Sequence, residues 1–165
     1  MKAPYTDIQV REIGCRRTAG TPFPSSTGAW VPSWANNPRE ILDPVRRRWV
    51  ALTPEEWVRQ NTILFLHKQC GYPLELMQVE AAITLNGLTR RCDIVVYDKN
   101  VHPWMIVECK KEEVAINQKV VDQACRYNLV LQVPYLFLTN GRQQLCLHVD
   151  TKTQSLSQVN LPQHE

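Results

Sequence analysis

Two acidic residues and a lysine lie at strand-like, apolar segments near the middle of the chain. Asp93 lies within the segment 91–97. Glu108 and Lys110 end the next apolar run. Because side chains alternate between the two faces of a strand, Glu108 and Lys110 are predicted to share one face, with Cys109 on the other. Buried charges are costly unless they are paired or bound to a metal, so this grouping needs a chemical reason.

The two carboxylates indicate a site for a hard divalent cation. Mg2+ prefers oxygen ligands, so Asp93 and Glu108, with the backbone carbonyl of Cys109, would form part of a magnesium site, which Mn2+ would also fit. A cation there would lower the pKa of bound water, and Lys110 could orient or deprotonate that water. This chemistry is phosphodiester hydrolysis. The alternative is that both acids pair with Lys110 and Arg91 in a fold-stabilising network.

Two further acids are candidate metal ligands. Glu56 ends the segment Thr53-Pro54-Glu55-Glu56, in which a threonine N-cap, a proline and a glutamate at the third position predict the start of a helix. That capping role explains Glu56 as well as a metal role does. Glu80 lies on a predicted strand and faces either the site or the solvent.

The elements that must position these residues follow the order helix, three strands, helix and two strands. Asn-Gly at 86–87 is a strong hairpin signal, and it makes the first three strands a meander. The helices are predicted at 53–70 and 117–128, and the strands at 78–85, 88–97, 104–110, 134–139 and 144–149.

The second predicted helix places Gln123 and Tyr127 four residues apart, and therefore on one face. Asp93, Glu108 and Lys110, followed by this pair, resemble the PD-(D/E)xK nuclease superfamily in the branch that carries a QxxxY motif. Within it, the chain is similar to the amino-terminal nuclease domain of type I restriction enzyme R subunits, especially its short stand-alone versions. The similarity covers residues 41–150, with its clearest stretches at 41–46, 52–60, 107–110 and 135–141.

The resemblance implies a restriction-endonuclease-like fold of the α/β (α+β) class, a mixed β-sheet flanked by helices. It also implies a metal-dependent endodeoxyribonuclease that uses Mg2+. Asp93 and Glu108 would be the metal ligands and Lys110 the catalytic lysine. Gln123 and Tyr127 match the motif that supports the site and touches the DNA backbone. Many superfamily members place an additional acid on the first helix, where Glu56 lies.

The sequence departs from the family pattern in two places. Cys92 stands where the motif's name has a proline, at a position that varies in the superfamily. The chain contains no GxxxxGK[ST] phosphate loop, so we expect it not to translocate DNA by itself. Two roles therefore remain open: a nuclease, alone or with other restriction subunits, and a nucleic-acid-binding or assembly module that keeps the fold without turnover.

Composition bounds the organisation of the chain. With 165 residues, 44% hydrophobic and 21% charged, we expect one globular domain at 41–150, an N-terminal arm (1–40) packed on it and a loosely held tail (151–165). Six dispersed cysteines without a CxxC pair favour a reducing compartment. No segment resembles a signal peptide or a membrane span, so we expect a cytoplasmic protein without a membrane partner.

Charge suggests DNA as the partner. The formal net charge is +3, and basic runs at 46–48, 90–91 and 110–111 could line a phosphate track, although any one run is more often a solvated face. Nothing resembles a base-reading helix-turn-helix or zinc finger, so contacts should be mainly to the DNA backbone. A homodimer would suit cleavage of both strands.

Overall fold

The computed structural model describes residues 10–12, 39–150, 152–153 and 155–164. Of the expected N-terminal arm, residues 1–40, it describes 10–12 and 39–40, and both pieces lie in strands. The rest of the predicted arm lies outside the described residues.

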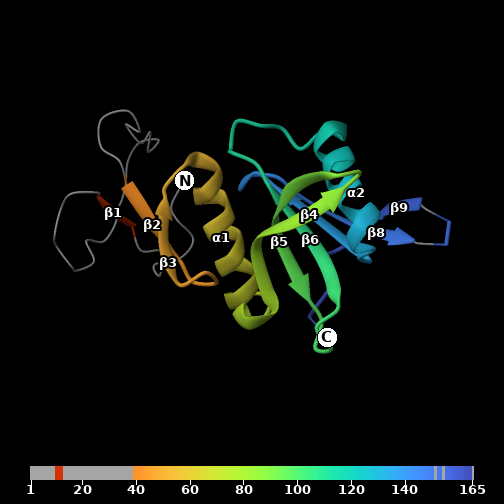
Figure 1. Cartoon of the computed structure of the whole chain (residues 1–165), viewed down its shortest axis with the longest axis horizontal. Coiled ribbons are helices and arrows are strands. Elements are labelled where there is room, and N and C mark those ends of the chain that lie inside the picture. Colours follow the sequence, from red (N-terminus) through yellow and green to blue (C-terminus); the bar gives the residue numbers. More distant parts are fainter. Residues whose placement is uncertain (1–9, 13–38, 151, 154, 165) are drawn as a thin grey trace.

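The described residues form two β-sheets and two α-helices (Figure 1). The smaller sheet is antiparallel, in the order β1-β2-β3, and the larger sheet has the order β4-β5-β6-β7-β8-β9. The elements are β1 (Val10–Glu12), β2 (Arg39–Asp43), β3 (Arg48–Ala51), α1 (Pro54–Lys68), a short 3-10 helix (Leu74–Leu76), β4 (Met77–Leu85), β5 (Leu88–Tyr97), β6 (Pro103–Cys109), α2 (Gln118–Leu131), β7 (Tyr135–Thr139), β8 (Gln144–Asp150) and β9 (Ser155–Gln158).

The larger sheet is mixed and covered on both faces. β6 and β7 run parallel, whereas the other neighbouring strands are antiparallel. A parallel pair needs a crossover connection, and α2 provides it between β6 and β7. Buried residues of α1 pack on one face of this sheet and those of α2 on the other. The predicted α/β fold, a mixed sheet flanked by helices, is confirmed.

Helix α1 lies between the two sheets (Figure 1). Thr53 Oγ1 accepts a hydrogen bond from the backbone N–H of Glu56 at 3.0 Å, which confirms the predicted N-cap. Leu64 packs with Ile41 of the small sheet, and Val58 belongs to the core beneath the large sheet. Because both of its sides are buried, α1 fixes the small sheet against the large one.

Strands β4 and β5 change face halfway along their length. Val79 belongs to the core on the α1 side, whereas Ala81 belongs to the core on the α2 side. Regular strands place such residues, two apart, on the same face. Ile94 and Cys92, their partners on β5, show the same change. Glu80, between the two, has a φ of 54°, in the left-handed region that side chains other than glycine seldom adopt.

The described residues of the segment expected to be a loosely held tail, 152–153 and 155–164, instead extend the sheet and pack on its core. Strand β9 pairs antiparallel with β8. Beyond it, Tyr72 Oη donates a hydrogen bond to the carbonyl of Pro162 at 2.5 Å, and the His164 ring contacts the carbonyl of Tyr97 at 2.8 Å. The composition of this segment is polar, but its backbone pairing and these side-chain contacts hold it in place.

Neither described helix is long and apolar enough to cross a membrane. The cysteines that the structure describes are free thiols; they are Cys70, Cys92, Cys109, Cys125 and Cys146.

Candidate active site

Four of the predicted site residues meet between β6 and α2. Lys110 Nζ donates a hydrogen bond to Glu108 Oε1 at 2.6 Å, and Gln123 Nε2 donates to the same oxygen at 2.6 Å. Lys110 Nζ also donates to Gln123 Oε1 at 3.1 Å. Gln123 Nε2 further donates to Tyr127 Oη at 3.1 Å. Gln123 therefore reaches the predicted acid and lysine directly, and Tyr127 reaches them through Gln123.

Local geometry explains this meeting. Cys109 belongs to the core on the α1 side, so its neighbours Glu108 and Lys110 project towards α2, as the alternation of a strand predicts. Gln123 and Tyr127 stand one helical turn apart on α2 and share the face that meets them. The Lys110 backbone N–H donates to the carbonyl of Thr139 on β7 at 2.9 Å, which fixes the backbone at the end of β6.

Asp93 reaches the same strand end from β5. Its Oδ2 accepts a hydrogen bond from the Cys109 backbone N–H at 2.7 Å. From there the charge of Asp93 raises the pKa of both Glu108 and Lys110, the residues on either side of Cys109. The other oxygen, Oδ1, accepts a hydrogen bond from Arg59 Nη2 of α1 at 2.7 Å.

Glu108 carries a charge that its surroundings disfavour. Its exposed fraction is 2%, and burial, followed by the charge of Asp93, raises the pKa of Glu108 to about 7 despite the opposing effect of Lys110. Oε1 accepts two hydrogen bonds, whereas Oε2 is buried without a hydrogen-bond partner among the described residues. A buried carboxylate oxygen without a donor, next to a second carboxylate, is suited to binding a cation.

These residues fit an open cation site better than a closed one. In the described ranges no group of three or more His, Cys, Asp or Glu side chains is arranged to hold a metal ion. Mg2+ usually keeps several waters and is held by one or two carboxylates together with substrate phosphates, so a pair of acids is sufficient. Asp93 and Glu108 match that pattern.

Lys110 is expected to be an ammonium group in this setting. Burial lowers the pKa of Lys110, but the hydrogen bond and the charge of Glu108, with a further contribution from Asp93, raise it by more. The net shift is upward, so Lys110 is suited to neutralising negative charge rather than to removing a proton.

Glu55 of α1, which the sequence analysis did not single out, also lies near the site. Its Oε1 is 3.9 Å from Arg59 Nη2, the atom that pairs with Asp93. Burial, followed by the charge of Asp93, raises the pKa of Glu55, whereas Lys110 and Arg59 lower it. The charge of Glu55 in turn raises the pKa of both Glu108 and Lys110. Helical spacing is the sequence signal that could have identified Glu55. Glu55 stands three residues before Val58, and Val58 packs towards the large sheet.

Glu56 and Glu80, the two further candidate ligands, lie in a separate group of charges. Glu56 Oε1 accepts a hydrogen bond from Arg46 Nη2 at 2.8 Å, and Oε2 accepts one from Arg59. The Glu56 carboxylate is therefore directed to these two arginines and not to the backbone N–H of the N-cap, Thr53. Glu80 Oε2 accepts a hydrogen bond from Arg46 Nη1 at 2.6 Å. The structure therefore does not bring these two acids to Glu108.

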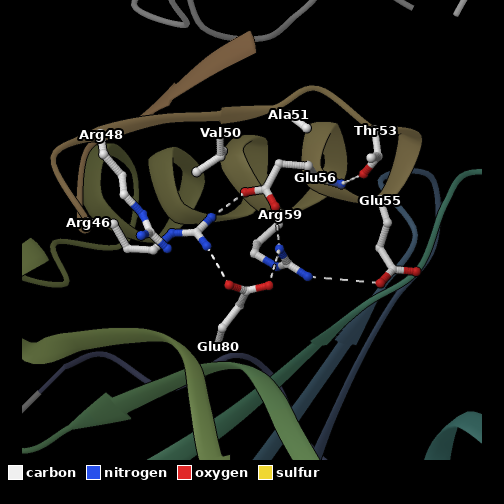
Figure 2. A pocket seen from close by; sticks show the side chains of 9 residues that line it. All are labelled: Arg46, Arg48, Val50, Ala51, Thr53, Glu55, Glu56, Arg59 and Glu80. Atoms are coloured by element: carbon white, nitrogen blue, oxygen red, sulfur yellow. Dashed lines mark hydrogen bonds and ion pairs between the residues drawn. The ribbon is translucent and has the colours of Figure 1, made fainter. Parts of the chain in front are cut away.

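A cavity of about 390 Å³ adjoins this group, between the small sheet, the start of α1 and β4 (Figure 2). Its lining consists mainly of charged side chains, with two small or apolar residues and the N-cap Thr53. The lining residues are Arg46, Arg48, Val50, Ala51, Thr53, Glu55, Glu56, Arg59 and Glu80.

Comparison with known proteins adds one finding. The sequence model of a protein family described as "Type I restriction enzyme R protein N terminus" matches residues 54–162. The matched region extends from the first residue of α1 to the segment beyond β9, and it contains Asp93, Glu108, Lys110, Gln123 and Tyr127. The cavity residues before position 54 lie outside it. A comparison with curated proteins finds no match.

Proposed function

Because the chain belongs to the family of type I restriction enzyme R protein N termini, we propose that it is a Mg2+-dependent DNA endonuclease with a PD-(D/E)xK site. The observation that carries the proposal is the arrangement around Glu108. One of its oxygens is held by Lys110 and Gln123, while the other is buried without a donor among the described residues.

In this proposal Asp93 and Glu108 hold the cation, and the carbonyl of Cys109 is a further ligand. A bound Mg2+ or Mn2+ would supply a polarised phosphate and a more acidic water. Lys110 neutralises charge that develops on the phosphoryl oxygens. Gln123 fixes Glu108 and Lys110 relative to one another, because it bonds to both.

Metal removal tests this function. Purified protein is incubated with supercoiled plasmid in Mg2+, in Mn2+ and in excess EDTA. We expect nicked and linear products with either metal and none with EDTA. Without the cation, the carboxylate pair has no Lewis acid to polarise the phosphate or to acidify a water molecule. Labelled RNA and single-stranded DNA in parallel reactions identify the preferred nucleic acid. Intact plasmid under all three conditions would contradict the proposal.

A binding or assembly module is the alternative, and one contact favours it. Arg59 already compensates the charge of Asp93, at 2.7 Å, as it would in a protein that needs no metal there. This alternative predicts DNA binding that is indifferent to Mg2+ and to Asp93→Asn, without cleavage. Its partners would be DNA and other restriction subunits.

The β4–β5 hairpin carries exposed basic groups close to the site. Residues 88–91 are all exposed, and the side chain of Arg91 is 72% exposed. Arg91 Nη1 lies 4.0 Å from Glu80 Oε2. Glu80 in turn lies 3.9 Å from Arg59, the partner of Asp93. Arg46 is different, since its side chain is 12% exposed and pairs with three acids. Arg46 is therefore not available to contact DNA phosphates, although the sequence suggested such a contact. We propose instead that the β4–β5 hairpin contacts the DNA backbone.

We expect the double variant Arg90→Ser/Arg91→Ser to bind duplex DNA about tenfold more weakly near 0.1 M salt, and to reduce the slope of log K against log salt by about two. Fluorescence anisotropy in EDTA measures binding without cleavage. The control Lys99→Ser/Lys152→Ser removes equal charge from two exposed turns elsewhere. Equal losses in both double variants would show a general charge effect and contradict a hairpin contact.

A further inference from the structure

A ring of four alternating charges lines the cavity (Figure 2). This charge ring consists of Arg46, Glu56, Arg59 and Glu80. Arg46 pairs with Glu56 at 2.8 Å and with Glu80 at 2.6 Å, and Arg59 pairs with Glu56 and lies 3.9 Å from Glu80. Its members come from the β2–β3 turn, α1 and β4, so the ring joins the small sheet, the helix and the edge of the large sheet.

Arg59 links the charge ring to the site. Its Nη2 lies 2.7 Å from Asp93 Oδ1, while its Nη1 pairs with Glu56. The side chain is 8% exposed. Burial lowers the pKa of Arg59, but the charges of Asp93 and Glu56 raise it by more, so the guanidinium stays charged. Its Nε is buried without a hydrogen-bond partner among the described residues.

The charges around Asp93 are nearly balanced only because Arg59 is present. The charge of Asp93 raises the pKa of both Glu108 and Glu55, and Lys110 lowers both. Arg59 is the second cation, paired with Asp93 at 2.7 Å. Without Arg59, three carboxylates would face one ammonium group. Such a cluster attracts a divalent cation more strongly, because the attraction grows with the uncompensated negative charge.

We propose that Arg59 is a positioning residue that acts as an internal counter-cation for Asp93, stabilising the site without metal and weakening its affinity for divalent cations. The inference rests on the proposed function, since it takes Asp93 as a metal ligand. Asp93 would keep its orientation without Arg59, because Oδ2 accepts the Cys109 N–H at 2.7 Å. Removing the guanidinium would therefore free Oδ1 for the metal without displacing the carboxylate.

Arg59→Met tests this role, since methionine fills much of the same space without charge. We expect the Kd for Mn2+, measured by isothermal titration calorimetry, to fall about tenfold relative to the unmodified protein. In EDTA the Tm should fall by several degrees, and Mn2+ should raise it by more than in the unmodified protein. Arg59→Lys, which keeps the charge, should return the Kd towards that of the unmodified protein.

Arg46→Met is the matched control, because it removes the same charge from the charge ring but not a partner of Asp93. Its Kd for Mn2+ should stay within about twofold of the unmodified protein. Arg59→Gln is a second variant with the same expected direction, for use where Arg59→Met does not fold in EDTA.

The outcomes separate this proposal from the function on which it rests. Unchanged or weaker Mn2+ binding in the Arg59→Met and Arg59→Gln proteins overturns the counter-cation role, as does an equal gain in Arg46→Met. In either case, Mn2+ binding by the unmodified protein that is lost in Asp93→Asn leaves the proposed function standing. If no protein in the set binds Mn2+, the metal site itself is overturned, and the role of Arg59 with it.

Discussion

Replacing Lys110 by methionine is expected to lower the rate of Mg2+-dependent DNA cleavage by about a thousandfold. The Lys110 ammonium is fixed by Glu108 Oε1 at 2.6 Å and by Gln123 Oε1 at 3.1 Å, so its charge lies at a defined position beside the carboxylate pair. A phosphate held there would gain negative charge in the transition state, and methionine could not compensate it. Single-turnover cleavage of plasmid DNA measures the loss.

Lys111→Met is the control, because it removes the same charge from an exposed neighbour. DNA binding in EDTA, measured alongside, separates weaker binding from slower chemistry. Cleavage by Lys110→Met within about tenfold of the unmodified protein would contradict a role for Lys110 in the transition state. A lower Tm with unaltered cleavage would instead support the fold-stabilising ion-pair network.

The core of the site follows from short-range rules. Strand alternation places Glu108 and Lys110 on one face and Cys109 on the other, and helical spacing joins Gln123 to Tyr127. These relations need only the element type, which hydrophobic patterns predict well over segments of this length. The contact between the two pairs then follows from a crossover helix that packs on the strand before it.

The second layer of the site depends on tertiary structure and could not be predicted from local pattern. The first turn of α1 contains both Glu55 and Glu56, and which of them faces the site depends on how the helix is rotated between two sheets. Because α1 is buried on both sides, its sequence shows no single apolar face. From the sequence, an arginine on a helix such as Arg59 is ordinarily expected to face the solvent. It is buried because Glu80 and Asp93 turn towards it where the strands change face.

Glu108→Gln is expected to abolish metal-dependent cleavage and, in EDTA at pH 8, to raise the free energy of unfolding by about 1–2 kcal/mol. Burial and the charge of Asp93 raise the pKa of Glu108 from 4.5 to about 7, so the folded protein disfavours the ionised form. Glutamine keeps an oxygen that can accept the bonds from Lys110 and Gln123 and removes the charge. Chemical denaturation in EDTA, with cleavage measured separately, tests both effects.

The pH dependence of this gain has a defined sign. A carboxyl group whose pKa is raised by folding contributes stability that is fully present below about pH 4.5 and is lost as the pH rises through about 7. The advantage of Glu108→Gln should therefore be small at pH 4.5 and largest above pH 7, whereas the exposed control Glu113→Gln should show none. Mn2+ should reverse the order of stabilities, because it stabilises the protein that retains the carboxylate. A destabilised Glu108→Gln protein in EDTA at pH 8 would mean that Glu108 and Lys110 form a structural ion pair, and that its unpaired oxygen serves no cation.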